Sequence, residues 1–431
     1  MSKRNVRVIC AMAMLIVMAL LWDNRAAGAP AVQSEVIDSA DNRELTASLI
    51  TCWPGSEIYE LCGHTALRIR GEGIDSVWNY GLFNFNEPNF IYRFVKGETD
   101  YMVAGYPFAW FLPEYVSAGR RVVEQDLNLT PEETLALLRN LREASLPQNS
   151  RYRYNYVKDN CSTRVINQID EATPVKINYP DTSEFGTFRN EMRVYHKNYP
   201  WYQFGIDLAL GSGLDYPLSP REEMFVPLVL YNRASAARLS DGRSLVREER
   251  ILNEGTDNAV LPPTSWWVAP LALSWLVSLI ALCLGGYDMW KWRISKGLYF
   301  IWFFILALAG TLVSFLVFIS VHEATSPNAL VLWLNPLQFL FCIGILSRRL
   351  RILSIIMAWY NVIVVTGLLI SWPFISQSAN PAFFPLMGST AMLAAIYAII
   401  NRKKSYNIRL GSKKTESAKA LATNEITEKT K

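Results

Sequence analysis

The feature that most constrains this chain is a series of long uncharged stretches after residue 264. Each is 18 to 23 residues long, and they cover 265–285, 298–320, 328–346, 352–371 and 383–400. A helix of about 20 residues spans the roughly 30 Å hydrocarbon core of a bilayer. Helices of a soluble bundle would show polar faces at a 3.6-residue period, and 298–320 has none. The sequence therefore predicts an all-α domain of five transmembrane helices over 265–400.

The connections between these stretches predict the orientation of the chain. Basic residues follow the first, third and fifth stretches: Lys291, Arg293, Lys296, Arg348, Arg349, Arg351, Arg402, Lys403, Lys404, Arg409, Lys413 and Lys414. The alternate connections, 321–327 and 372–382, contain no Lys or Arg. Short cytoplasmic loops carry the excess of positive charge. We therefore expect everything before residue 265 to lie outside the cytoplasm.

The two ends of the chain agree with this topology. A basic start, an apolar run over 8–22 and a small-residue stretch over 26–29 indicate a signal peptide at 1–29, although an uncleaved anchor would give the same topology. We expect an exported domain over 30–251, a linker over 252–264 and a polar cytoplasmic tail over 401–431. The balance of 42 basic and 38 acidic residues shows no excess typical of nucleic-acid binders, so the expected contact is with membrane.

Local patterns in the exported domain predict several elements. Residues 66–70 and 76–80 alternate apolar and polar side chains around a Gly-Glu-Gly turn, which indicates a β-hairpin. Thr130, Pro131 and Glu133 form a capping-box signature, which predicts a helix with Leu135, Leu138 and Leu141 along one apolar face. A tyrosine-rich strand over 152–157 then leads to a helix that starts near Cys161.

The position of Cys161 suggests chemistry. Asn160 is a good N-cap, and the unpaired N–H groups and positive dipole end of a helix lower the pKa of a thiol there, so we expect a nucleophile. Only Cys52, Cys62 and Cys161 fall in the exported domain. A Cys52–Cys62 disulfide would leave Cys161 free. The alternative is that all three are reduced, and the sequence does not choose between the two.

A nucleophilic thiol needs a base, and the chain has three histidines. His64 follows Gly63 at the start of the predicted hairpin and is our candidate base. His196 lies in a polar, unpatterned stretch and is expected at the surface. Because the histidines are dispersed and no Gly-rich phosphate loop occurs, we expect no metal and no nucleotide cofactor.

These motifs resemble the Lnb-type family of bacterial envelope proteins. The matching residues of the exported part are Cys52, Tyr59, Gly63-His64-Thr65-Ala66, Asn79-Tyr80-Gly81, Asn89-Phe90, Phe94 and Asp159-Asn160-Cys161-Ser162-Thr163. The membrane part matches through Leu332-Trp333-Leu334-Asn335-Pro336-Leu337 and the attached apolar stretches. The resemblance covers nearly the whole chain after the signal peptide. Cys62 departs from the aromatic or aliphatic residue expected at its position.

The resemblance implies a lipoprotein N-acyltransferase, without a cofactor, in the bacterial inner membrane. Its catalytic domain would lie on the periplasmic side and have an α+β permuted papain-like fold, as in NlpC-type hydrolases and lecithin:retinol acyltransferase. Such a fold places a polar residue on the strand after the histidine. Asn79 is the best candidate for that residue, and Asp75 and Asp159 are weaker ones.

In the expected reaction, Cys161 takes an acyl chain from a phospholipid as a thioester and passes it to the α-amine of a diacylglyceryl-cysteine lipoprotein, with His64 as the base. A second polar cluster, His322, Glu323 and Asn335, is a candidate for binding the lipid or the acceptor. The structural alternative is a solvated loop and an amide that satisfies the backbone at Pro336. Two competing functions share these residues: an NlpC-type cell-wall peptidase or amidase, and a membrane-tethered binding protein without chemistry.

Overall fold

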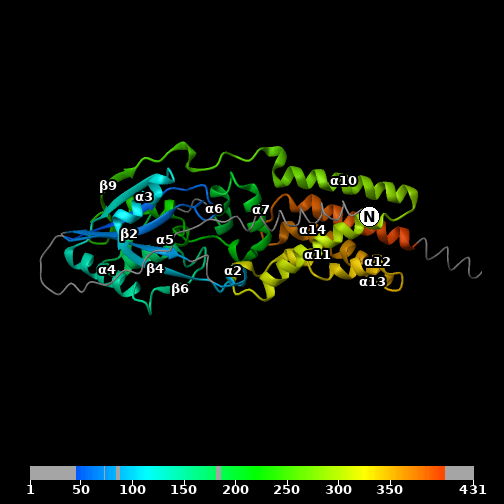
Figure 1. Cartoon of the computed structure of the whole chain (residues 1–431), viewed down its shortest axis with the longest axis horizontal. Coiled ribbons are helices and arrows are strands. Elements are labelled where there is room, and N and C mark those ends of the chain that lie inside the picture. Colours follow the sequence, from blue (N-terminus) through cyan, green and yellow to red (C-terminus); the bar gives the residue numbers. More distant parts are fainter. Residues whose placement is uncertain (1–44, 72, 84–87, 181–185, 403–431) are drawn as a thin grey trace, which may run out of the picture.

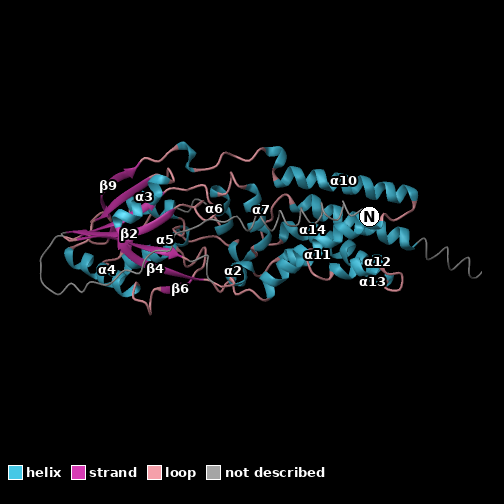
Figure 2. Ribbon diagram, in the orientation of Figure 1, coloured by secondary structure: helices cyan, strands magenta, loops and turns pink. Residues whose placement is uncertain are grey.

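The computed structural model describes residues 45–71, 73–83, 88–180 and 186–402. The predicted signal peptide and nearly all of the predicted tail lie outside these residues. The molecule is elongated, with a sheet-containing domain at one end and a bundle of long helices at the other (Figure 1). The described strands all belong to the first of these domains (Figure 2).

A seven-stranded antiparallel sheet forms the centre of the N-terminal domain. Its strand order is β6-β4-β3-β2-β1-β5-β9, and β7 and β8 form a separate pair. The strands are β1 Thr46–Cys52, β2 His64–Gly71, β3 Ile74–Leu82, β4 Asp100–Pro107, β5 Val122–Leu127, β6 Arg151–Arg153, β7 Ile177–Asn178, β8 Arg238–Leu239 and β9 Val246–Asn253. Strands β2 and β3 are the hairpin that the alternating residues predict, with Leu67 paired to Trp78.

Helices cover both faces of this sheet. The described helices of the N-terminal domain are α2 Phe90–Lys96, α3 Phe108–Ser117, α4 Pro131–Ala144, α5 Cys161–Ala172, α6 Phe188–Tyr195, α7 Pro200–Ala209, α8 Pro220–Glu223 and α9 Pro227–Ala236. One core lies between the sheet and α4, α5 and α9, and contains Leu67 and Val165. A smaller core lies between the opposite face and α3, and contains Ala66 and Phe111. The sheet is therefore buried on both sides.

Two predictions about local structure need correction. The α4 capping box is present, but Leu135 is exposed, because the buried leucine face of α4 is Leu137, Leu138 and Leu141. The predicted strand over 152–157 ends at Arg153. The side chain of Asn155 accepts hydrogen bonds from the N–H groups of residues 157 and 158, and this turn reverses the chain before α5.

The C-terminal domain is helical and apolar. Its described helices are α10 Pro270–Lys291, α11 Lys296–Phe318, α12 Gln338–Leu346, α13 Arg351–Tyr360, α14 Thr366–Ser371 and a last helix over Phe383–Arg402. A π-helical turn over Asn361–Val365 joins α13 to α14. Within the described residues, four helices are long and apolar enough to cross a membrane, counting Arg351–Phe374 as one.

The third of the five predicted spans, 328–346, is not one continuous helix in the part of the chain that the structure describes. That stretch contains a short 3-10 turn over Ala329–Leu332, a break, and the nine-residue α12. Pro336 lacks the N–H that a continuous helix needs at the break. The amide of Asn335 donates to the carbonyl oxygens of residues 331 and 332, and Gln338 donates to that of residue 333. Side-chain amides thus replace the missing helical hydrogen bonds.

The two domains contact each other through several polar bonds. The N–H of Val321, after α11, donates to the carbonyl oxygen of Lys96 at 2.9 Å. Asn328 donates to the carbonyl oxygen of Leu208 in α7, and Arg193 in α6 donates to Ser378. The connections after α11 and after α14 therefore both face the N-terminal domain.

Candidate active site

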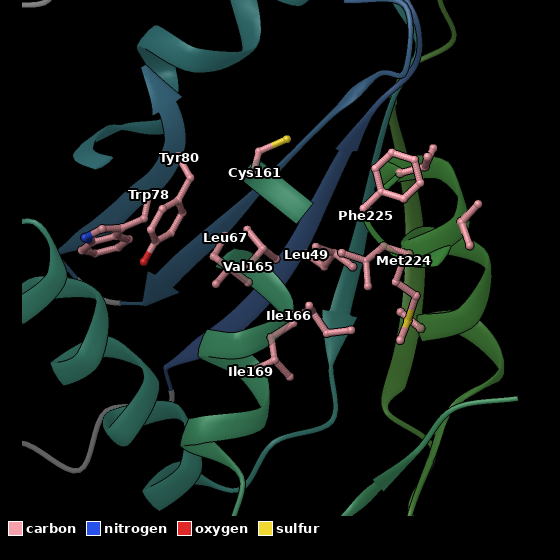
Figure 3. Packing of buried hydrophobic residues seen from close by; sticks show 14 of the residues in the cluster. Leu49, Leu67, Trp78, Tyr80, Cys161, Val165, Ile166, Ile169, Met224 and Phe225 are labelled. Carbon is pink, nitrogen blue, oxygen red and sulfur yellow. The ribbon is translucent and has the colours of Figure 1, made fainter. Parts of the chain in front are cut away.

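Cys161 is the first residue of α5. Asn160 has extended backbone angles, and its side-chain oxygen accepts from the N–H groups of Ser162 at 2.9 Å and Thr163 at 3.0 Å. Its amide nitrogen donates to the carbonyl oxygen of Phe225, which ties the helix start to the segment before α9. Figure 3 shows the Cys161 sulfur pointing away from the apolar side chains that α5 packs against the sheet.

His64 and Asn79 lie together on neighbouring strands. The Nε2 atom of His64 is 2.6 Å from Oδ1 of Asn79, and the Asn79 amide donates to the Tyr106 hydroxyl at 2.8 Å. Because the amide oxygen only accepts, Nε2 carries the proton and Nδ1 keeps the lone pair. The imidazole also stacks on the ring of Tyr115 in α3, with the centroids 6.3 Å apart. The ring of the candidate base is therefore held on two sides.

Backbone pairing between β2 and β3 stops next to these groups. The two strands pair from Leu67 and Trp78 to the turn, and the described register does not extend to residues 64–66. The N–H of Thr65 is hydrogen-bonded to the Cys161 thiol. Thr65 directly follows His64, so the start of α5 lies at the start of β2.

The thiol and the imidazole lie toward opposite faces of the sheet at this point. Cys161 belongs to the core that contains Leu67, whereas His64 pairs with Cys52, whose side chain lies in the core against α3. The described residues show no hydrogen bond between Cys161 and His64. In enzymes without substrate, catalytic hydrogen bonds are often long and tighten only when the substrate binds.

Burial governs the protonation of both groups. Cys161 is 9% exposed, and this burial raises the pKa of its thiol above the ordinary value, although N–H groups of Thr65 and Ser162 lower it. The expected net shift toward thiolate is therefore wrong, because desolvation outweighs the helix end. Burial also lowers the pKa of His64 to about 4, as does the charge of Arg120, whereas the hydrogen bond that Nε2 donates to Asn79 acts to raise it. At neutral pH the site holds a thiol and a neutral imidazole.

Several residues of this site were not found from the sequence. Tyr106 and Tyr115 hold Asn79 and His64, and Arg120 stacks on Tyr115 with its charge 4.8 Å from the ring centroid. No spacing in the sequence links these positions. The pairing of β3 with β4, which sets Asn79 opposite Ala104, brings Tyr106 near.

The other two exported cysteines are free thiols. Cys62 lies 3.3 Å from the hydroxyl of Tyr156, and Cys52 is fully buried opposite His64. Of the two arrangements that the sequence allows, the structure has the reduced one. Asp75 and Asp159, the weaker candidates for the third residue, pair instead with Arg68 and Arg164.

The second predicted cluster is divided between two places. Nε2 of His322 is 2.8 Å from the carbonyl oxygen of Phe94 in α2. Glu323 forms an ion pair of 2.9 Å with Lys158, three residues before Cys161. Asn335 is buried in the membrane domain, where its amide also donates to the hydroxyl of Tyr360 at 3.3 Å. His322 and Glu323 therefore contact the N-terminal domain. Asn335 lies within the broken third segment and bonds to its backbone.

The expectation that His196 is a surface residue is wrong. The side chain is 1% exposed, and its Nδ1 atom is 2.8 Å from Oε1 of Gln203 in α7. Helix α7 covers the end of α6, a tertiary contact that the polar local sequence does not reveal.

Comparison with known proteins agrees with this architecture. Residues 33–191 match the family described as Lnb N-terminal periplasmic domain, and residues 263–405 match the Lnb transmembrane domain. No curated protein and no solved structure matches the chain. The two matches occur in the order of the two structural domains and together cover well over half of the sequence. The chain therefore belongs to the Lnb-type family, and it is a membrane protein with a periplasmic domain.

Proposed function

We propose that this protein is a lipoprotein N-acyltransferase that works through a thioester on Cys161. The observation that carries the proposal is the place where β2 and β3 stop pairing, because there a capped helix start holds a thiol next to a strand that begins with a fixed, neutral imidazole. A thiol at a helix start, a histidine on a strand and a polar partner on the next strand also support the permuted papain-like fold.

In the first step, His64 accepts the thiol proton through Nδ1 while the sulfur attacks an ester carbonyl of a phospholipid. The carbon–oxygen ester bond breaks, and the departing lysophospholipid alkoxide takes the proton from His64. In the second step, the α-amine of a diacylglyceryl-cysteine attacks the thioester. An amide forms, the amine gives up a proton through His64, and that proton restores the thiol. Asn79 is a positioning residue for His64.

A row of aromatic rings supports a lipid as the donor. Tyr154 packs against the core that contains Cys161, and its ring stacks on that of Tyr101 with the ring centroids 4.1 Å apart. The row continues to Phe83, whose ring centroid is 4.9 Å from that of Tyr101. It then reaches Phe90 of α2, whose ring centroid is 6.0 Å from that of Phe83.

Helix α2 connects this row with the membrane domain. The ring centroid of Tyr92 is 6.2 Å from that of Phe315, near the end of α11. The ring centroid of Phe94 is 6.4 Å from that of His322. Ile91, Tyr92 and Phe94 are all about half exposed. An acyl chain that leaves the bilayer beside α11 would find apolar contacts along this row toward the thiol. A soluble wall peptide would not need them.

The test uses the full-length protein in phospholipid vesicles with a synthetic diacylglyceryl-cysteine peptide as the acceptor. Mass spectrometry should detect the N-acylated peptide with the wild-type protein and with Cys62→Ser, a matched thiol control in the same domain. Cys161→Ala should yield no product above the protein-free background. Product formation by Cys161→Ala at the wild-type rate would refute the thioester mechanism.

A further inference from the structure

A pocket of about 180 Å³ lies at the junction of the two domains, and none of the candidate catalytic residues lines it. Its walls come from the end of α6, from α7 and from the first turn of α10. The polar lining includes Arg193, His196, Lys197 and Gln203, and the segment Ala269–Leu271 forms an apolar wall.

Two of the residues that line the pocket each have a buried nitrogen atom without a hydrogen-bond partner among the described residues. These atoms are Nε2 of His196 and Nε2 of Gln203. The two residues are 1% and 8% exposed. Because Oε1 of Gln203 only accepts, the proton between the two residues is on Nδ1 of His196, 2.8 Å away. Burial lowers the pKa of His196, so the ring is neutral.

These two atoms therefore have complementary needs. Nε2 of His196 is an acceptor without a donor, and the amide N–H of Gln203 is a donor without an acceptor. One hydroxyl group satisfies both, because it donates one hydrogen bond and accepts another. An unprotonated phosphodiester oxygen would satisfy only the amide and would leave the acceptor of His196 unpaired.

The net charge around the pocket is positive through Lys197. Arg193 donates to Asp207 at 3.1 Å and to Ser378 at 2.8 Å. Arg189 pairs with Asp207 and with Asp215, so these two arginines and two aspartates balance one another. Lys197 is exposed at the rim. The residues that line the pocket include no acid. A phosphate near Lys197 and Arg193 would meet two cations.

The pocket also lies at the level expected for lipid headgroups. Trp266 and Trp267, 80% and 62% exposed, directly precede α10, and such aromatic residues gather at membrane interfaces. The indole of Trp201 in α7 donates to the carbonyl oxygen of Val268 at 2.9 Å, which joins α7 to the start of α10. Leu271 lines the pocket and is 44% exposed on the membrane helix.

We propose that this pocket binds the headgroup of an anionic phospholipid that carries a free hydroxyl, with the hydroxyl between His196 and Gln203 and the phosphate toward Lys197 and Arg193. The acyl chains would lie along the start of α10. This site is independent of the proposed acyl transfer, because it shares no residue with the Cys161 site. A bound lipid there would join α6 and α7 to the membrane domain.

The experiment measures lipid binding to the full-length protein by native mass spectrometry in detergent. The probes are phosphatidylglycerol, phosphatidylcholine, which lacks the hydroxyl, and soluble glycerol 3-phosphate. Phosphatidylglycerol should bind most tightly. Gln203→Leu should weaken its binding by about tenfold, the factor that roughly 1.4 kcal/mol of lost hydrogen bonding gives. Lys197→Gln, which leaves the fold untouched, should weaken it about threefold.

The matched control is Lys176→Gln, because Lys176 is an exposed lysine of the same domain and does not line the pocket. Its lipid binding should equal that of the wild type. Equal binding of phosphatidylglycerol and phosphatidylcholine would overturn the proposal, as would unchanged binding in Lys197→Gln. Glycerol 3-phosphate binding as tightly as the lipid would reassign the pocket to a soluble phosphate ester.

Discussion

The partly buried base makes a quantitative prediction about pH. Burial lowers the pKa of His64 to about 4, whereas an ordinary histidine titrates near 6.5. A base works only when it is unprotonated, so a lower pKa moves the loss of activity to lower pH. At pH 5 a group with a pKa of about 4 is roughly 90% neutral, whereas one with a pKa near 6.5 is only about 3% neutral.

The assay is single-turnover formation of the Cys161 acyl-enzyme by the full-length protein with phospholipid, quenched and measured by mass spectrometry between pH 4 and pH 8. The wild-type rate at pH 5 should remain within about 10% of its value at pH 7, by the fractions above. His64→Gln should lower the rate at pH 7 by about 10² to 10⁴, the usual contribution of a general base, and should remove the fall below pH 5.

Two results would refute this reasoning. A wild-type rate that halves near pH 6.5 would mean that His64 is not buried as the structure has it, or that another group limits the reaction. A His64→Gln protein with the wild-type rate at pH 7 would remove His64 from the mechanism. Circular dichroism of each variant confirms that the fold persists.

Three further predictions concern the fold. Asn160→Ala removes the cap of α5 and should lower the free energy of unfolding by about 1–2 kcal/mol and slow acyl-enzyme formation, as measured by thermal unfolding and the same quench assay. Gly310→Ala places a Cβ against the backbone of the broken third segment and should cost about 1–3 kcal/mol, whereas Gly297→Ala on the same helix meets open space and should leave the melting temperature unchanged. In intact cells, an impermeant maleimide should label Lys176→Cys, and Arg349→Cys only after lysis; the reverse pattern would contradict the predicted orientation.

The parts of the site that follow from local sequence could be predicted. The start of α5 depends on Asn160 and the residues just after it, and the hairpin depends on alternation around one turn. His64 and Asn79 belong to that hairpin, so their proximity follows from a short-range feature.

Features that depend on distant contacts could not be predicted. Burial of His196 needs α7 folded over α6, and the raised pKa of the Cys161 thiol depends on how tightly the core closes around it. A side-chain amide that satisfies the backbone at Pro336 was one of the alternatives drawn from the sequence, and the hydrogen bonds of Asn335 and Gln338 agree with it. The residues at which the helix ends and restarts depend on packing around the break and could not be read from an apolar stretch of spanning length.

Burial of Cys161 serves both steps of the proposed reaction. A protonated, 9% exposed thiol forms thiolate only when a base takes its proton, so the resting protein is protected from the oxidation that exposed thiolates undergo. After the first step, the same enclosure would keep water from the thioester until an amine arrives. The proposed acceptor, like the proposed donor, would be anchored in the bilayer. The hydrogen bond between Val321 and Lys96 and the ion pair between Glu323 and Lys158 hold the N-terminal domain against the end of α11. Both proposed substrates would approach there. An enclosed thiol beside the membrane domain therefore favours transfer of the acyl chain to an amine over hydrolysis by water.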